Sequence, residues 1–405
     1  MKKILILGAS AAGIGVLNKL RLLAPEAHIT CVTAEQELPY NKCLLAEYCS
    51  GEKQEQDVYT KNKQFFQDQQ IDFLTGARVV RIDTAARVVH AISAQEPVVI
   101  PYDKLFVGLG TQPIVPPIPG IDQEGVYTFH YLRDVQKIKE RVATARRAVV
   151  IGAGLSGLEA ADALHKQGIQ VTLVEAGARM LATTLDAQGH AHFIEILRAA
   201  GVSVLLQNPV VAITGKQGHV SGVICADGMQ LSADLVIVAV GSRPDMQLFA
   251  DTGIAHTADG LIVDNHMRTS DPVVWAGGDI CIVNDQLTGT AVRSALWPDA
   301  MMQGMYAAYN MTGHERVYPG IIPFHSSSFF GQRFASCGVV TNVPDTCDEL
   351  VMKTESGYHL FVVDRVASIL RGFVMLGDAR HVGRARRALV THEVVTPDIL
   401  ASFSR

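Results

Sequence analysis

The chain has 405 residues, of which 48% are hydrophobic and 19% charged, and its formal net charge at pH 7 is −5. This length allows roughly two to three domains with large cores, and the negative charge argues against a nucleic-acid binder, which would carry a basic stripe. No stretch approaches the roughly 18 consecutive apolar residues of a membrane span. Seven unevenly spaced cysteines indicate a reducing compartment rather than a disulfide framework. We therefore expect a cytoplasmic α/β protein.

The first elements are a strand, a glycine-containing turn, a helix and a second strand. Residues 2–7 and 27–32 have the apolar pattern of buried strands, and Glu35 lies 22 residues after Gly13. This arrangement predicts a dinucleotide site, in which the helix N-terminus receives the diphosphate and the acid binds the ribose. In the turn GASAAG, serine takes the place of the usual middle glycine and is small enough to keep the close approach. The residues expected to contact this nucleotide are Gly8, Ser10, Ala11, Ala12, Gly13 and Glu35.

A more regular unit of the same kind begins at residue 148. A β-branched run enters a G-x-G-x-x-G turn, a helix follows over 158–166, and a second β-branched run over 171–174 ends on an acid. The glycines permit the tight turn, the approach of a diphosphate and close helix–strand contact. The acid accepts hydrogen bonds from an adenine ribose and repels a 2′-phosphate, so the site suits NAD(H). Its residues are Gly152, Gly154, Gly157 and Glu175.

Two such units in one chain bind two nucleotides, and the usual partner of NAD is FAD, which supplies hydride chemistry that side chains lack. From Tyr318 onward, apolar runs over 358–363 and 369–376 and a helix from about Ala379 predict an antiparallel sheet with a terminal helix. The predicted fold class is α/β, with two Rossmann-like, three-layer dinucleotide-binding domains and a small α+β C-terminal domain. The expected ranges are 1–110 and 242–318 for an FAD domain, 112–240 for an inserted NAD domain, and 319–405 for the C-terminal domain.

Four further stretches carry a resemblance to a known family, and they occur in that family's order. They are Tyr102–Thr111, Ala233–Pro244, Thr269–Asp279 and Leu296–Gly304. With the two glycine turns, they make the whole chain similar to the pyridine nucleotide–disulfide oxidoreductases in the broad sense. The nearest likeness is to NADH–rubredoxin reductases, the flavin part of NADH-dependent nitrite reductase, and CoA-disulfide reductase or NADH oxidase relatives. One departure is Gly108-Leu109-Gly110, which stands where Ala-Thr-Gly is usual.

The resemblance implies roles for individual residues. Asp279 would hydrogen-bond the ribityl chain of FAD, and Trp297 would lie on the helix beside the flavin ring. Lys42 would stabilise the anionic reduced flavin, unless it is a solvated loop lysine. Glu159 would orient the nicotinamide, unless it is a helix-start carboxylate favoured by the dipole. The resemblance also adds Val80, Gly110 and Gly241 to the cofactor-binding set.

Cys43 separates two mechanism classes. In CoA-disulfide reductases and NADH oxidases, a single cysteine in this loop is the redox centre, whereas rubredoxin-type reductases tend to have a proline or an aliphatic residue there. The neighbouring Lys42 and a nearby helix start would lower the pKa of the thiol and make it reactive. The other interpretation is a buried space filler, because free cysteine is among the most buried residue types. A disulfide between Cys43 and Cys49 is a further alternative.

These features predict an FAD-dependent NADH oxidoreductase with Cys43, Lys42 and Glu159 as candidate catalytic residues. NADH would reduce the flavin, and the electrons would pass to a small redox protein of rubredoxin or ferredoxin type docking near Trp297 and the C-terminal domain. The alternative is a Cys43-dependent reductase of a disulfide, peroxide or oxygen. A third hypothesis is a flavoprotein that binds NADH to report redox state. No nucleic-acid or membrane partner is expected, and a homodimer is left open.

Overall fold

The structure is a computed structural model, and it describes residues 1–354 and 357–403. The chain forms two compact units, each assembled from separate segments. Unit 1 comprises Met1–Leu45, Gln54–Gln112 and Ser242–Ile321, and unit 2 comprises Ala46–Lys53, Pro113–Gly241 and Ile322–Arg405. Within the described residues, no helix is both long and apolar enough to cross a membrane.

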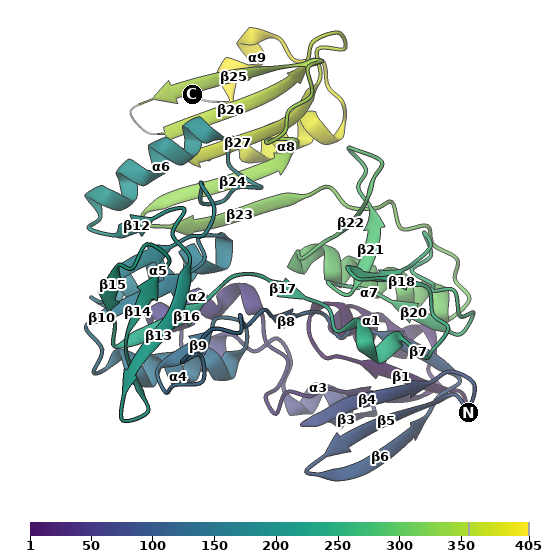
Figure 1. Cartoon of the computed structure of the whole chain (residues 1–405). Helices are drawn as coiled ribbons and strands as arrows, with labels where there is room; N and C mark the ends of the chain where they lie inside the picture. The colour runs from purple at the N-terminus through teal and green to yellow at the C-terminus, as the bar shows by residue number, and fades with distance from the viewer. Residues whose placement is uncertain (355–356, 404–405) are drawn as a thin grey trace. The chain divides into compact units, whose positions relative to one another are not determined.

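A parallel sheet forms the centre of unit 1 (Figure 1). Its strands lie in the order β20, β7, β1, β2, β3, with bounds Val274–Ala276, Lys104–Val107, Lys3–Leu7, His28–Val32 and Ile71–Leu74. Every neighbouring pair is parallel. The last four residues of β1 and the last three of β7 are buried, as expected of parallel strands that are covered on both faces.

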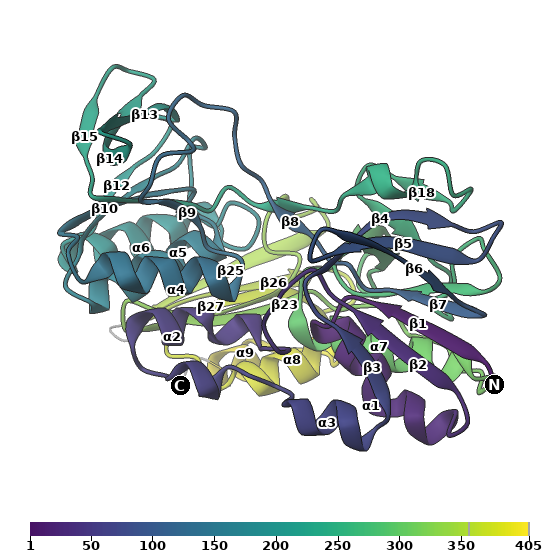
Figure 2. The same cartoon turned by 90° about the horizontal axis from the view of Figure 1, so that it is seen from below.

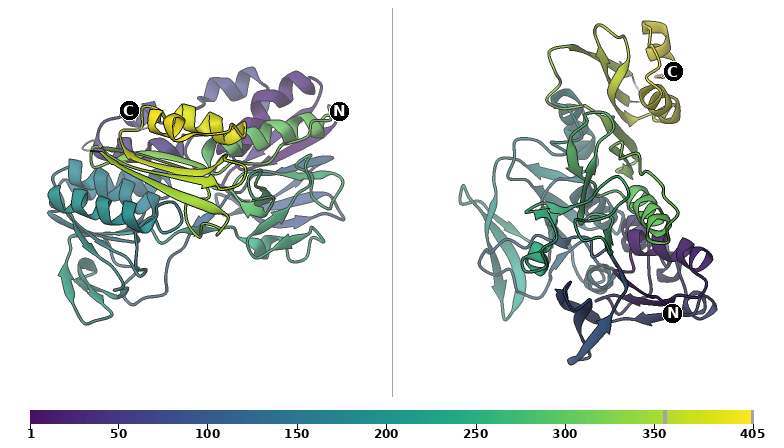
Figure 3. Two further views of the ribbon diagram at one scale, coloured as in Figure 1. Left: turned by 90° about the horizontal axis from the view of Figure 1, so that it is seen from above. Right: turned by 90° about the vertical axis from the view of Figure 1, so that its right-hand side faces the viewer.

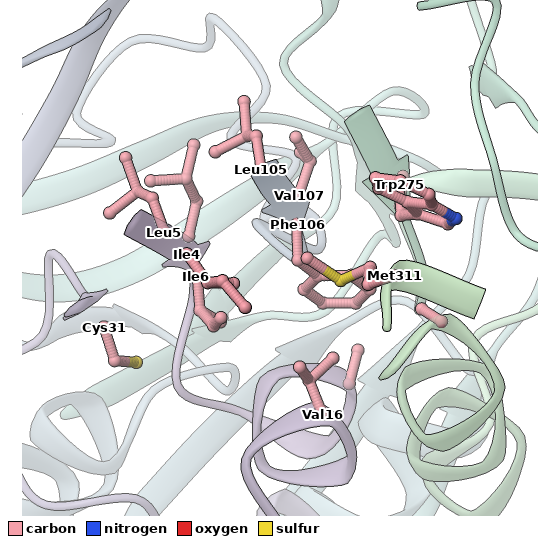
Figure 4. Close-up of a cluster of buried hydrophobic side chains, with 14 of the residues drawn as sticks. Ile4, Leu5, Ile6, Val16, Cys31, Leu105, Phe106, Val107, Trp275 and Met311 are labelled. Atoms are coloured by element: carbon pink, nitrogen blue, oxygen red, sulfur yellow. The ribbon is translucent and has the colours of Figure 1, made fainter. Parts of the chain in front are cut away.

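Two helices cover one face of this sheet, α1 (Ala11–Leu23) and α7 (Trp297–Met311), and an antiparallel sheet covers the other (Figure 2). The helices meet closely, because a Cβ added at Gly304 would lie 2.0 Å from the carbonyl oxygen of Ala12. The buried side chains between the layers, including those of Phe106 and Trp275, form one apolar core (Figure 4). The antiparallel sheet consists of β4 (Ala77–Asp83), β5 (Val88–Ser93) and β6 (Glu96–Pro101).

The remaining elements of unit 1 are short. A four-stranded sheet has the order β18, β19, β21, β22, with bounds His256–Thr257, Gly260–Ile262, Cys281–Asn284 and Ala291–Arg293. Helical turns are α3 (Lys63–Asp68), η1 (Lys42–Leu44), η2 (Glu55–Asp57) and η3 (Met246–Phe249). The chain leaves unit 1 through β8 (Gln112–Pro113) and returns to unit 1 through β17 (Ser242–Arg243).

Unit 2 contains a second parallel sheet, in the order β12, β11, β10, β16, β9. Its bounds are Ser203–Leu205, Gln170–Val174, Arg147–Ile151, Leu235–Val238 and Val126–Thr128. The helices of this part are α2 (Leu45–Ser50, with its last five residues in unit 2), α4 (Leu132–Val142), α5 (Leu155–Lys166) and α6 (Ala187–Ala199). A three-stranded antiparallel sheet follows, with β13 (Val210–Lys216), β14 (His219–Cys225) and β15 (Gln230–Ser232).

The C-terminal part of unit 2 is an antiparallel sheet in the order β23, β24, β27, β26, β25. Its bounds are Phe324–Phe329, Gln332–Gly338, Leu370–Gly377, Gly357–Asp364 and Cys347–Thr354. Helices α8 (Val382–Val390) and α9 (Pro397–Ser402) lie on one face of it, as the yellow ribbons of Figure 3 show. Tyr358 of β26 links the sheet to α6, because its hydroxyl donates to Asp186 Oδ2 at 2.6 Å.

The predicted α/β class with parallel sheets is confirmed, and so is the antiparallel sheet near the C-terminus. Two predicted helix starts are wrong. Helix α5 begins at Leu155 rather than at residue 158, because the glycine turn continues directly into the helix with Gly154 as its N-cap. Helix α8 begins at Val382 rather than near Ala379, because Ala379–His381 form a turn after β27.

Candidate functional site

The glycine turn of unit 2 leaves the N-terminus of α5 open. Gly152 has φ of 102°, and a Cβ there would lie 2.4 Å from the carbonyl oxygen of Ala239. A Cβ at Gly157 would lie 2.0 Å from the carbonyl oxygen of Gly152, so these two positions require glycine for packing within the chain. Gly154 differs, since no atom lies within 4 Å of a Cβ added there. It is the N-cap of α5 and provides no side-chain cap, so the first-turn amides face this open space.

Glu175 is held against this turn. Its Oε2 accepts a hydrogen bond from the backbone amide of Ala153 at 2.8 Å, and its Oε1 accepts one from Gly177 at 2.7 Å. Strands β10 and β11 end level with each other, with Ile151 opposite Val174, which brings the carboxylate to the turn. The carboxylate therefore lies where it can bind ribose hydroxyls, and its charge disfavours a 2′-phosphate.

Glu159 lies two residues past Gly157 on α5. The hydroxyl of Ser327, on β23, donates to Glu159 Oε1 at 2.8 Å. Burial is the main cause that raises the pKa of Glu159 to about 7, and the charges of Glu47 and Asp162 act in the same direction. The carboxyl group can therefore hold or release a proton near neutral pH.

The glycine turn of unit 1 has the same construction. Gly8 has φ of 97°, and a Cβ at Gly13 would lie 1.9 Å from the Gly8 carbonyl oxygen. Ser10 is the N-cap of α1 but makes no side-chain cap hydrogen bond, and Ala11 and Ala12 are buried in the first turn. The amides at this helix start are therefore available to an anion.

A small pocket adjoins this turn, lined by Ala9, Ser10, Thr33, Glu35, Glu37, Leu38, Pro39 and Tyr40. Within it, Glu35 Oε2 accepts a hydrogen bond from the Tyr40 hydroxyl at 2.5 Å. Glu37 Oε2 is buried and makes no hydrogen bond within the described part of the chain. A buried acceptor without a donor is costly, so the pocket suits a ligand that donates hydrogen bonds, such as a ribose.

Three charged residues of unit 1, Lys42, Asp279 and Arg293, interact electrostatically. Burial raises the pKa of the Asp279 carboxyl, and the positive charges of Lys42 and Arg293 lower it. Arg293 Nη2 donates to the Ser242 carbonyl at 3.2 Å, while Nη1 is buried with no hydrogen-bond partner among the described residues. This cluster can hold an anionic or hydrogen-bonding group of a cofactor.

The other predicted cofactor residues come from separate elements and loops of the two units. Trp297 is the first residue of α7, and Gly110 follows β7 with φ of 64° and open space around its Cβ position. Gly241, with φ of 108°, is the last unit 2 residue before the chain returns to unit 1. Val80 lies within β4, and 39% of it is exposed.

Cys43 is exposed on η1, where Asn41 Oδ1 accepts a hydrogen bond from its backbone amide at 3.0 Å. The prediction of Cys43 as a buried space filler is therefore wrong, because the 3-10 turn directs this residue to the surface. Cys49 is buried instead, and burial raises its pKa to about 12. Both are thiols, so the alternative of a Cys43–Cys49 disulfide is also wrong for this structure.

Sequence reasoning missed Arg293, Ser327 and Glu47. Arg293 lies four residues before Trp297, so its closeness in sequence to the stretch Leu296–Gly304 could have identified it as a site residue. The other two are far from Glu159 in sequence, and nothing in the linear pattern connects them with it.

The fold and the two open glycine turns, each followed by a carboxylate, define a two-nucleotide α/β oxidoreductase. The profile of the pyridine nucleotide-disulphide oxidoreductase family matches residues 2–304, and the chain belongs to this family of NAD(P)H-dependent flavin oxidoreductases. Family members use FAD and NAD(H) as cofactors.

Relatives with known names cover most of the chain. The NADH-dependent phenylglyoxylate dehydrogenase subunit epsilon of Aromatoleum evansii is 31% identical over 85% of this chain and 80% of its own length. The rubredoxin-NAD(+) reductase of Pseudomonas putida is 28% identical, over 78% of this chain and 81% of its own. The assimilatory nitrate reductase electron transfer subunit of Bacillus subtilis is 29% identical over 96% of this chain, which spans only 49% of that protein. Among solved structures, a NAD-dependent persulfide reductase from A. fulgidus superposes with a TM-score of 0.91 and 27% identity, covering 96% of this chain and 77% of the other.

Proposed function

We propose that the protein is an FAD-dependent NADH oxidoreductase that passes electrons to a small redox protein of rubredoxin or ferredoxin type. In this proposal, residues 1–110 and 242–318 bind FAD, residues 112–240 bind NADH, and residues 319–405 form a small α+β domain. The observation that carries it is the pair of open helix N-termini, at Ser10 and Gly154, each with a carboxylate at the end of the next strand.

NADH would bind at the turn of unit 2. The open amides of α5 would bind its diphosphate. Glu175, which two backbone amides already orient, would accept hydrogen bonds from the hydroxyls of the adenine ribose. Glu159 would contact the nicotinamide end with a carboxyl group that Ser327 orients.

FAD would bind at the turn of unit 1, with its adenosine ribose at Glu35. Asp279 would accept hydrogen bonds from the ribityl chain. Lys42, whose charge acts on Asp279, would place its positive charge near the flavin. The flavin, when bound, accepts a hydride equivalent and can release electrons one at a time. The positive charge of Lys42 would favour the anionic reduced form.

The names of two relatives favour an electron-carrier acceptor. One is a rubredoxin-NAD(+) reductase and another an electron transfer subunit, and both align with most of this chain. An acceptor of this kind needs only to approach the flavin edge, so no deep substrate pocket is required.

One observation favours a second function. Cys43 is exposed beside Lys42, as a reactive thiol must be, and one structural relative is a persulfide reductase. A Cys43-dependent reductase of a disulfide or persulfide is therefore the second candidate.

The decisive experiment is an anaerobic NADH titration of the flavin-loaded protein, followed by addition of oxidised rubredoxin, ferredoxin or CoA disulfide. Under the main proposal, NADH bleaches the flavin and an iron–sulfur carrier reoxidises it equally well in the wild type and in Cys43→Ser. Reoxidation by CoA disulfide alone, lost in Cys43→Ser, would establish the second candidate. Failure of NADH to bleach a bound flavin would refute both.

A further inference from the structure

Strand β25 forms one edge of the C-terminal sheet of unit 2, as Figure 1 shows. It pairs with β26 along all of its length and without a bulge, and no other strand of the described chain pairs with its outer side. An exposed edge can pair with a strand of another chain, and many proteins prevent this with proline, a bulge or a charge that repels the incoming strand. The sequence of β25, CDELVMKT, contains no proline. Its charges therefore decide which strand this edge can accept.

Alternate residues of β25 direct their backbone groups away from β26. The carbonyl of Thr346, just before the strand, accepts from the amide of Arg365 at 2.9 Å, so the even-numbered residues direct their backbone groups toward β26. The amide of Asp364, on β26, donates to the carbonyl of Ile369 at 2.9 Å, on the side away from β25, which agrees with this alternation. The outward amides and carbonyls therefore belong to the odd-numbered residues, which include Glu349, Val351 and Lys353.

The beginning of this outer edge is closed by Arg365. Its guanidinium donates to the carbonyls of Asp345 and Cys347, at 3.0 and 3.3 Å. From residue 349 onward the edge is open, because the side chains of Glu349 and Lys353 are exposed and Leu350 is 39% exposed. Neither of the two charged side chains forms an ion pair or a hydrogen bond with another described residue. The open part of the edge is thus the segment 349–353.

Two copies of this segment complement each other when they pair antiparallel about a twofold axis at Val351. A twofold axis perpendicular to the sheet keeps every side chain on its own face. With Val351 opposite its own copy, Glu349 of each strand lies opposite Lys353 of the other, and Leu350 lies opposite Met352. Opposite charges that face each other across strands stabilise the pair, and the outward backbone groups form about six hydrogen bonds. An axis at Leu350 would instead place Glu349 opposite Val351, so that its charge would be unmatched.

We propose that β25 is a self-association surface, through which two copies of the chain join their C-terminal sheets edge to edge into one continuous sheet. An edge that rejects its own copy places like charges opposite each other, whereas this edge places Glu349 opposite Lys353 twice. The interface is isologous, as in most homodimers. A contact of one short strand is smaller than a standard interface of roughly 1,600 Å², so we expect a reversible dimer with a dissociation constant of about 1 to 100 μM. The proposal does not depend on the proposed function.

The first test is the concentration dependence of the mass of the flavin-loaded protein. Sedimentation equilibrium should give the mass of one 43.7 kDa chain, with its flavin, in dilute solution and approach twice that mass in concentrated solution. A protein that stays monomeric up to about 200 μM, well above the expected dissociation constant, would overturn the proposal.

Charge reversals test the register. In Glu349→Lys both positions of each contact are positive, and in Lys353→Glu both are negative, so either variant alone should self-associate about 10- to 100-fold more weakly. An equimolar mixture of the two should dimerise like the wild type, because each lysine then meets a glutamate. Glu393→Lys, a control with the same charge change at an exposed position outside β25, should also dimerise like the wild type. Single variants that dimerise like the wild type, or a mixture that stays monomeric, would overturn the proposal.

Hydrogen exchange tests the contact at the backbone. In the monomer, the amides of Glu349, Val351 and Lys353 face solvent and should exchange rapidly, whereas those of Leu350 and Met352 are protected by β26. A higher protein concentration should protect the first group and leave the second unchanged. Val351→Pro removes an outward amide that β26 does not use, so it should prevent dimerisation in a protein that unfolds at nearly the wild-type temperature. A dimer that forms without added protection of the first group would show that the copies meet elsewhere, and would overturn the proposal.

Discussion

Replacing Gly154 with alanine should weaken nucleotide binding and leave the stability of the fold nearly unchanged. No atom lies within 4 Å of a Cβ at this position, and its φ of −79° is normal for an L-residue. The change should therefore alter the free energy of unfolding by no more than about 1 kcal/mol, the difference between glycine and alanine at an N-cap. The added methyl group, however, occupies the space in which the diphosphate approaches the amides of α5.

The expected loss of affinity follows from the hydrogen bonds that the diphosphate would forgo. Losing one charge-assisted hydrogen bond costs about 1.5 to 3 kcal/mol, which corresponds to a dissociation constant for NADH roughly 10- to 100-fold higher. Isothermal titration with ADP-ribose measures this directly, and thermal unfolding measures the stability. Gly157→Ala is the contrast, because its Cβ would lie 2.0 Å from the Gly152 carbonyl oxygen, so it should destabilise by about 1 to 3 kcal/mol. Unchanged ADP-ribose affinity in Gly154→Ala would show that the diphosphate does not lie at this turn.

Three further outcomes are expected. The folded-state pKa of Glu159 is raised to about 7, so the stability it contributes is complete below about pH 4 and is lost as pH rises through 7. Glu159→Gln should consequently raise the free energy of unfolding at about pH 8 by up to roughly 3 kcal/mol and leave it unchanged at about pH 4, as measured by urea denaturation at each pH. Tyr358→Phe removes the 2.6 Å hydrogen bond to buried Asp186 and should cost about 1 to 3 kcal/mol in the same assay; a cost near zero would mean that water replaces the hydroxyl. Cys43→Ser should preserve NADH-dependent reduction of an artificial acceptor to within about twofold, because Cys43 is exposed on η1 and contributes to neither glycine turn. A tenfold loss of activity in that assay would show that electron transfer to the artificial acceptor requires the Cys43 thiol.

The sequence identified those features that depend on local geometry. Gly8 and Gly152 were recognisable because only glycine readily adopts their positive φ, and the apolar runs of β1 and β10 are typical of buried parallel strands. The start of α5 was misplaced because the turn and the helix share residues, and sequence patterns place boundaries poorly.

The environment of Glu159 could not be predicted, because it is assembled by tertiary structure. Ser327 is 168 residues away in the chain, and Glu47 reaches unit 2 only because a short segment between two stretches of unit 1 packs there. The exposure of Cys43 could not be predicted for a related reason. Average burial of cysteine says nothing about a 3-10 turn capped by Asn41, which exposes Cys43, while the helix after it buries Cys49.

The interleaved order of the segments has a consequence for synthesis on the ribosome. Every strand of the parallel sheet of unit 2 lies between residues 126 and 238, so that sheet can close as soon as β16 has emerged. The sheet of unit 1 joins residue 4 to residue 104 and residue 105 to residue 274, so β7 keeps an unpaired edge until β20 is made. Such edges invite pairing with other chains. We expect flavin loading to come late in biogenesis, and nascent chains that stall before residue 274 to be the aggregation-prone species.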